Sequence, residues 1–166
     1  MPHGKHSRVL LAGPLAFKLL NPGFRANARK EARFLRQLRS TGMAPRFYFR
    51  LGRLLVMERI QGTPVRNMTP DQVRQTAPLF LKVLHQLDGL GIQKEEAHRP
   101  DKHFIHTPQG VRLLDFERAR KNERPSNVTQ FVNFLDRYFP GIRKLGHAYK
   151  SSYDLKPLLE FIRAKK

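Results

Sequence analysis

The sequence contains no cysteine, few acidic residues and no long apolar run. Without cysteine, neither a disulfide framework nor a thiolate metal site can form. No apolar segment approaches the length that spans a membrane, and the N-terminus lacks the apolar segment of a signal peptide. We therefore expect a soluble, cytoplasmic protein that is not bound to a membrane.

The scarcity of acids leaves a large excess of positive charge. The 166 residues include 32 Lys and Arg against 13 Asp and Glu, a formal net charge of +19. Such a balance predicts phosphate-rich partners, namely RNA, DNA or a ribosome bound through a basic surface. The alternative is a solvated basic surface with no dedicated partner. Length and a hydrophobic content of 40% suit one domain with one core.

The first elements predicted are two short strands joined by a turn. The segment up to Ala12 and the segment from Leu15 to Leu20 flank Gly13-Pro14 and predict a hairpin. Within the second strand, Lys18 has apolar neighbours on both sides. Its ammonium either reaches solvent from the sheet edge or faces a cleft and holds phosphate.

Residues 24–40 have the periodicity of a helix, whose apolar face carries Ala28, Ala32, Leu35 and Leu38. Glu31 is the single acid in this strongly basic segment. It pairs either with neighbouring arginines along the helix or with Lys18 on the inside.

The middle of the chain predicts two more strands, at 47–49 and 54–57, followed by an extended polar connection at 58–65. Thr69 and Pro70 then form the start of a helix that runs to about Leu87. The expected core stripe of that helix consists of Val73, Ala77, Phe80, Leu81, Leu84 and Leu87.

The segment from Leu90 to Ala119 reads as a charged loop, a short hairpin and an acidic turn with the letters D-F-E. Asp115 follows an apolar pair of leucines. An acid at the exit of a buried strand either caps the next turn or binds a cation, and a carboxylate suits Mg²⁺. Helices are then expected at 126–135, capped by Ser126 or Asn127, and at 153–166.

The order of these elements, and the residue that each carries, resembles the protein-kinase-like superfamily. The chain is most similar to RIO-type and other small atypical Ser/Thr kinases with an R-P-x-K-H loop and a D-F-E-R-A segment, here Arg99–His103 and Asp115–Ala119. The resemblance implies an α+β, minimal kinase-like fold in one domain, 1–166. An antiparallel-sheet N-lobe (1–62) precedes a reduced helical C-lobe (63–166).

The resemblance also implies a site for ATP and Mg²⁺. Lys18 would meet the α- and β-phosphates, and Glu31 would hold Lys18. Asp115 would bind the metal. Nucleotide contacts would come from a shortened covering loop, from the position before the hinge and from the hinge itself: Gly4, Ser7, Val9, Met57, Glu58 and Ile60. The usual first strand and the full glycine-rich loop are missing.

The catalytic loop departs from the family pattern, because no H-R-D is present. One alignment places Glu96 at the catalytic Asp, and another places His98 there and His103 at the metal-binding Asn. Asp101 is a further candidate for the base. A carboxylate can accept a hydroxyl proton, whereas imidazole is a poorer Mg²⁺ ligand than oxygen.

The function expected from the resemblance is transfer of the γ-phosphoryl group of ATP to a Ser or Thr hydroxyl of a protein, including the chain itself. One alternative keeps the fold without the transfer: a nucleotide-binding ATPase or pseudokinase. Another is a basic RNA- or ribosome-binding module. After D-F-E no A-P-E follows, and a basic group could receive the acceptor or be merely solvated: Arg118, Arg120, Lys121 and Arg124.

Overall fold

The computed structural model describes residues 7–165, so Gly4 of the expected covering loop lies outside the described residues. The chain divides into two compact units. Unit 1 consists of Met1–Gly62 and Arg112–Ala119, and unit 2 of Thr63–Val111 and Arg120–Lys166. The segment that carries Asp115 therefore clusters with the first part of the chain.

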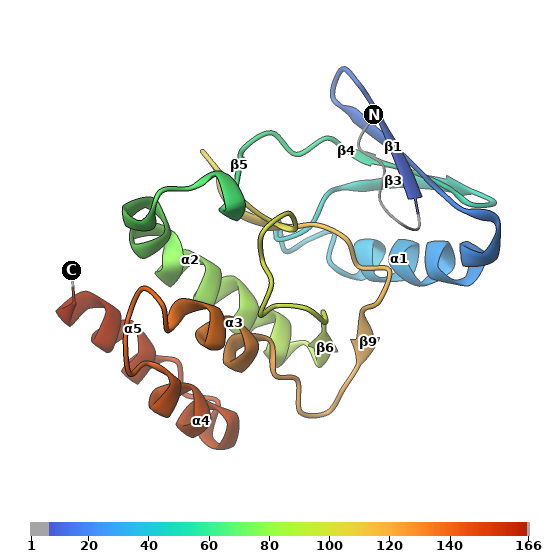
Figure 1. Ribbon diagram of the computed structural model, residues 1–166. Helices are drawn as coiled ribbons and strands as arrows, with labels where there is room; N and C mark the ends of the chain where they lie inside the picture. Colours follow the sequence, from blue (N-terminus) through green and yellow to red (C-terminus); the bar gives the residue numbers. More distant parts are fainter. Residues whose placement is uncertain (1–6, 166) are drawn as a thin grey trace. The chain divides into compact units, whose positions relative to one another are not determined.

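Unit 1 is built on a four-stranded antiparallel sheet in the order β1-β2-β4-β3 (Figure 1). Its strands are β1 (Ser7–Ala12), β2 (Leu15–Leu20), β3 (Phe47–Leu51) and β4 (Leu54–Glu58). The first hairpin turns at Gly13, whose φ of 53° lies in the left-handed region that glycine adopts without steric cost. The hairpin predicted around Gly13 and the two strands predicted at 47–49 and 54–57 are present.

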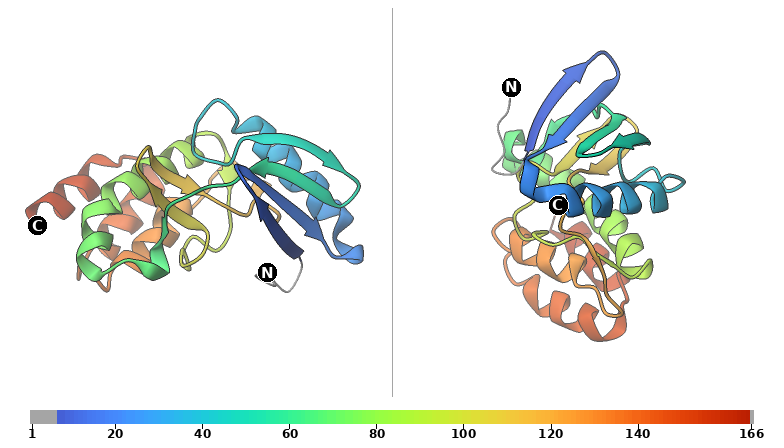
Figure 2. Two further views of the ribbon diagram at one scale, coloured as in Figure 1. Left: turned by 90° about the horizontal axis from the view of Figure 1, so that it is seen from above. Right: turned by 90° about the vertical axis from the view of Figure 1, so that its right-hand side faces the viewer.

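Helix α1 (Arg25–Gln37) follows the short 3-10 turn η1 (Pro22–Phe24) and lies along the sheet of unit 1 (Figures 1 and 2). The predicted apolar face is confirmed, because Ala28, Ala32, Leu35 and Leu38 are all buried. The opposite side of the helix presents arginines to solvent, so the helix is amphipathic in the expected sense.

Unit 2 contains short strands and four helices (Figure 1). The strands form a three-stranded sheet in the order β5-β7-β8 and a pair β6-β9. The strand bounds are β5 (Thr63–Pro64), β6 (Ile92–Gln93), β7 (Phe104–Thr107), β8 (Gly110–Leu113) and β9 (Arg120–Lys121). Two residues of β8 belong to unit 2 and the next two to unit 1.

The helices of unit 2 are α2 (Pro70–Gly89), α3 (Asn127–Leu135), α4 (Arg143–Ser152) and α5 (Lys156–Ala164), with the 3-10 turn η2 (Val65–Asn67) before them. Thr69 caps α2 as predicted, and Gln72 completes a capping box with it. The helix continues through Pro78, and its six predicted core residues are all buried. Three rings, Phe80, Phe104 and Phe131, pack with centroids 5.4 to 5.7 Å apart in the core of unit 2.

The prediction that the side chain of Ser126 or Asn127 caps α3 is wrong. Ser126 occupies the N-cap position, but its side chain makes no capping bond. Asp88, from the last turn of α2, accepts instead from the backbone N–H groups of Asn127 at 3.0 Å and Val128 at 3.3 Å. The buried carboxylate also accepts from the Tyr149 hydroxyl at 3.1 Å. A cap from a distant element leaves no local sequence signal.

The C-terminal region also differs from expectation. Helix α4 was not predicted, and the last helix begins at Lys156 rather than at Tyr153. Tyr153 has a φ of 52°, and this left-handed residue ends α4. In residues 7–165, no helix combines the length and the apolar character needed to cross a membrane.

Candidate active site

A buried lysine in unit 1 is surrounded by three carboxylates. Strand β2 directs Lys18 inward, where its Nζ lies 2.8 Å from Glu31 Oε2 and 2.9 Å from Asp115 Oδ1. Glu117 Oε2 lies 3.6 Å from the same nitrogen. Only 9% of the Lys18 side chain is exposed. The ammonium therefore does not reach solvent from the sheet edge, and the inward pairing with Glu31 is the one observed.

Glu31 connects α1 to the segment after β8. One carboxylate oxygen accepts from Lys18, and the other accepts from the backbone N–H of Phe116 at 3.3 Å. Both partners are buried with it, so Glu31 is an inward partner rather than one of the helix surface ion pairs. This arrangement fixes the Lys18 ammonium and the Asp-Phe backbone against the same side chain.

Asp115 adopts a φ of 65°, in the left-handed region that non-glycine residues seldom occupy. Its side chain is 30% exposed, whereas those of Glu31 and Glu117 are 2% and 9% exposed. Asp115 is thus the carboxylate of the cluster that an incoming ligand can reach.

Glu117 is the member of the cluster to which the sequence analysis assigned no role. It lies two residues after Asp115, in the turn that follows this left-handed residue. That spacing was the available signal.

The electrostatics of the cluster follow from one cation among three acids. Burial alone would lower the pKa of Lys18, but the carboxylates of Glu31 and Asp115 raise it above its ordinary value. Burial raises the pKa of Glu31; Lys18 opposes the rise, and the charge of Asp115 adds to it. Lys18 is therefore cationic, and its single positive charge is too small to balance the three carboxylates.

The same acids offer ligands to a metal ion. One carboxylate oxygen from each of Glu31, Asp115 and Glu117 can be chosen so that all lie within 4.8 Å of one another. Oxygen donors suit Mg²⁺, and two negative charges remain after Lys18 is counted. The donor set and the charge of the cluster both fit a divalent cation.

The other described residues assigned to nucleotide contacts lie on β1, at the end of β4 and, for Ile60, two residues beyond β4, where the side chain is half-buried. Val9 is the cross-strand neighbour of Lys18, and Ser7 pairs with Leu20. Met57 is buried opposite Ala16. The Glu58 side chain bonds to Arg112, and its backbone N–H donates to the Arg46 carbonyl at 2.8 Å, so both are already engaged in unit 1.

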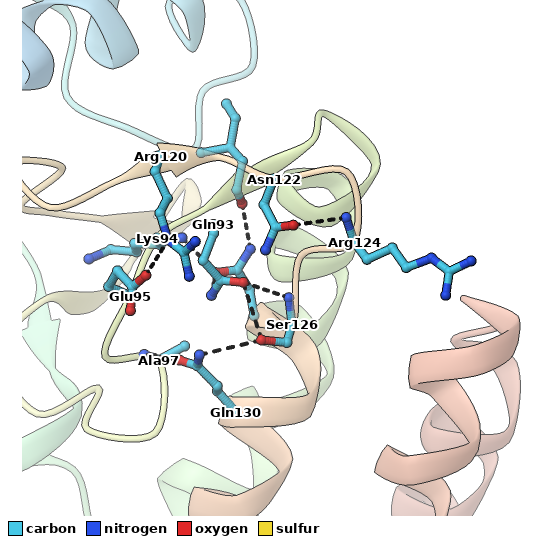
Figure 3. Close-up of polar contacts among 11 residues, drawn as sticks. Gln93, Lys94, Glu95, Ala97, Arg120, Asn122, Arg124, Ser126 and Gln130 are labelled. Atoms are coloured by element: carbon cyan, nitrogen blue, oxygen red, sulfur yellow. Dashed lines mark hydrogen bonds and ion pairs between the residues drawn. The ribbon is translucent and has the colours of Figure 1, made fainter.

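In unit 2, the loop after β6 is fixed at both ends by side chains of α3 (Figure 3). Asn127 Oδ1 accepts from the backbone N–H of Lys94 at 2.8 Å and from Gln93 Nε2 at 3.2 Å. Gln130 Oε1 accepts from the backbone N–H of Ala97 at 3.0 Å. These bonds hold the chain on either side of the two glutamates between Lys94 and Ala97.

Those glutamates are strained. Glu95 and Glu96 have φ values of 66° and 56°, which is rare for two consecutive residues with side chains. Glu95 is engaged by Arg120, whose Nε lies 2.7 Å from its carboxylate, and Glu96 is exposed (Figure 3 for Glu95 and Arg120).

The remaining catalytic-loop candidates also belong to unit 2. His98 and Asp101 are exposed, and His103 is half-buried in the turn before β7. The backbone carbonyl of Asp101 accepts from the Arg66 N–H at 3.1 Å. None of the three belongs to the carboxylate cluster around Lys18, which consists of unit 1 residues.

Two solved structures share this architecture. The Rio2 kinase-ADP/Mg²⁺-phosphoaspartate complex from Chaetomium thermophilum matches with a TM-score of 0.65 and 16% sequence identity, covering 98% of this chain and 68% of that one. The fold is protein-kinase-like. The kinase-like match extends to the Legionella pneumophila Lpg2603 kinase bound to IP6, with a TM-score of 0.59 and 14% identity over 98% of this chain and 72% of that one.

The predicted α+β, kinase-like fold is confirmed by these matches. No protein-family model matches the sequence, and no similar sequence is found among curated proteins. The kinase-like architecture is therefore recognised through its structure at an identity too low to transfer an activity.

Proposed function

We propose that this chain is an atypical kinase that binds ATP with Mg²⁺ and transfers the γ-phosphoryl group to a Ser or Thr hydroxyl of a protein, including its own. The observation that carries the proposal is Lys18, buried on β2 of a kinase-like fold and bonded to both Glu31 and Asp115. A cation so placed has the position and charge required to neutralise phosphates.

Each member of the cluster has a distinct task in this proposal. Lys18 binds the α- and β-phosphates. Glu31 keeps the Lys18 ammonium oriented when the Asp115 carboxylate binds a metal ion instead. Asp115 and Glu117 would hold Mg²⁺, which when bound neutralises phosphate charge during transfer. The Rio2 structure, which contains ADP and Mg²⁺, supports this choice of cofactors.

For the acceptor hydroxyl we assign Glu96 as the base. Its carboxylate is exposed on a left-handed turn that α3 anchors on both sides, an arrangement that holds a side chain in a costly but defined position. Asp101 and His98 are also exposed, but neither has a left-handed backbone conformation. His103 is not needed as a metal ligand, because carboxylate oxygens are available in unit 1.

The first experiment is a thermal unfolding titration with ATP, with and without Mg²⁺. At a ligand concentration of about 100 Kd, binding adds about 2.7 kcal/mol to the free energy of unfolding. For a chain of this size, that raises Tm by about 5–10 °C. We expect the shift in wild type to require Mg²⁺ and to be lost in Lys18→Ala and Asp115→Asn.

Two exposed residues provide matched controls. Lys30→Ala removes a lysine from the surface of α1, and Asp71→Asn removes an exposed carboxylate at the start of α2. Both variants should keep the full shift. A shift of equal size in all five proteins, or none in wild type, would contradict the nucleotide site.

A second measurement separates transfer from hydrolysis. The Rio2 complex contains a phosphoaspartate, which makes an ATPase the main alternative for this chain. With γ-labelled ATP, a kinase leaves acid-stable label on a hydroxyl, and Glu96→Gln removes it while keeping the nucleotide-induced Tm shift. Release of phosphate without acid-stable phosphoprotein would favour the ATPase.

A further inference from the structure

Unit 1 contains a second candidate site, a cavity of about 550 Å³ bordered by four arginines. Arg39 comes from the end of α1, Arg46 from the approach to β3, Arg59 from the segment after β4 and Arg112 from β8. They converge from four separate segments of the chain. Lys18, Glu31, Asp115 and Glu117 are not among the lining residues, so the cavity is distinct from the carboxylate cluster.

The cavity has one acidic lining residue, Glu58, and that carboxylate is already engaged. Glu58 Oε1 lies 3.2 Å from Arg112 Nη2, and Glu58 Oε2 accepts from the backbone N–H of Arg46 at 3.0 Å. One carboxylate balances one guanidinium. The cavity is therefore left with an excess of three positive charges.

Two of the guanidinium groups are held in place by backbone carbonyls. Arg112 Nη1 donates to the Ala44 carbonyl at 3.0 Å, and Arg59 Nη1 donates to the Gly13 carbonyl at 3.4 Å. A guanidinium has five N–H donors in a fixed plane, so these bonds orient the group and leave donors for a ligand. Orientation before binding lowers the entropy cost of capturing an anion.

We propose that this cavity binds a small molecule carrying two or more phosphate groups. Planar guanidinium groups bind phosphate oxygens in pairs, and three uncompensated charges call for more than one phosphate. The volume falls within the range of small-molecule pockets, about 300–1,000 Å³. A partly open pocket lined by arginines from four segments suits a compact polyanion better than an extended nucleic-acid backbone, which follows a longer surface groove.

The probe is inorganic tripolyphosphate, titrated calorimetrically without Mg²⁺ at about 0.15 M salt, where distant surface charges are screened. The test variant is Arg39→Gln with Arg46→Gln. Both side chains are exposed, and the backbone bond of Arg46 to Glu58 is kept. The matched control is Arg25→Gln with Arg29→Gln, which removes the same charge from the surface of α1.

We expect wild type and the control to bind tripolyphosphate alike, and the test variant to bind about tenfold or more weakly, because charge-assisted hydrogen bonds are lost. Equal weakening in the test and control variants would show general charge attraction and overturn the proposal. Loss of binding in Lys18→Ala would assign the anion to the carboxylate cluster and would also overturn it. The proposal would also be overturned if the test variant lost affinity for single-stranded RNA but kept its affinity for tripolyphosphate.

Discussion

At the scale of residues, the central feature is one ammonium shared by three carboxylates. Lys18 lies within 2.9 Å of Glu31 and Asp115 and within 3.6 Å of Glu117. Buried acids in this ratio repel one another, and removing them from water costs further free energy. The cluster is therefore poised to gain from an added cation, which is a property of a binding site rather than of a structural ion pair.

Glu31→Gln should change the dependence of stability on pH. Burial raises the pKa of Glu31 above its ordinary value of 4.5, so the folded state keeps this proton to a higher pH than the unfolded chain does. Between those two pKa values the folded state binds more protons, and stability contributed by Glu31 falls as pH rises. The free energy of unfolding of wild type minus that of the variant should therefore decrease upward from pH 4.5.

Urea unfolding from pH 4.5 to about neutral, without divalent cations, measures this difference. The exposed Glu123→Gln removes one carboxyl group elsewhere on the protein, serves as a control and should not reproduce the decrease. A wild-type advantage over Glu31→Gln that grows with pH would mean that Lys18 outweighs burial and that the pKa of Glu31 is not raised.

At the scale of elements, sequence periodicity correctly predicted the features that are determined within a single segment of the chain. The hairpin around Gly13 and the buried faces of α1 and α2 follow from alternation and 3.6-residue spacing, and they are present. Features made by distant partners could not be found this way. Asp88 caps α3 from another helix, and Glu117 joins a cluster whose other members are distant in sequence.

Helix α4 was not predicted, and Gly146 within it is a poor helix former. The structure gives that glycine a packing reason. A Cβ built at Gly146 would lie 2.7 Å from Val132 Cγ1 and 3.2 Å from Val132 Cβ, closer than packed carbons approach. Glycine thus lets α4 approach α3 closely, at the expense of helix propensity.

Gly146→Ala should therefore destabilise the protein although alanine favours helices. Overpacking in a core costs about 1–3 kcal/mol, against about 1 kcal/mol gained in helix propensity, so we expect a net loss of up to about 2 kcal/mol. Val132 is β-branched and fully buried, so it cannot rotate away freely. Urea unfolding measures the change in the free energy of unfolding.

The partner substitution tests the contact itself. Val132→Ala alone leaves a cavity and destabilises, but in combination with Gly146→Ala the new methyl group takes part of the vacated space. The double variant should be more stable than the sum of the two single effects predicts. Additive effects, or a stabilising Gly146→Ala, would show that α4 and α3 separate at no cost.

At the scale of the whole molecule, two properties carry different information. The kinase-like architecture is preserved at 14–16% identity to the solved kinases, because element order and a few buried residues define it. The net charge of +19 is unrelated to that fold. Charge and fold therefore predict separate activities, and each needs its own test.

The surface charge predicts salt-dependent binding to single-stranded RNA that does not involve Lys18. Neutralising about six phosphates gives a slope of log affinity against log salt near −4, or a loss of roughly 300-fold between about 50 mM and 200 mM salt. Lys18 is buried and already faces three carboxylates, so Lys18→Ala should leave both affinity and slope unchanged. Fluorescence anisotropy with a labelled oligonucleotide measures both quantities. A weak salt dependence would mean that the basic surface has no role in nucleic-acid binding. A loss of RNA affinity in Lys18→Ala would mean that RNA and nucleotide bind to the same carboxylate cluster.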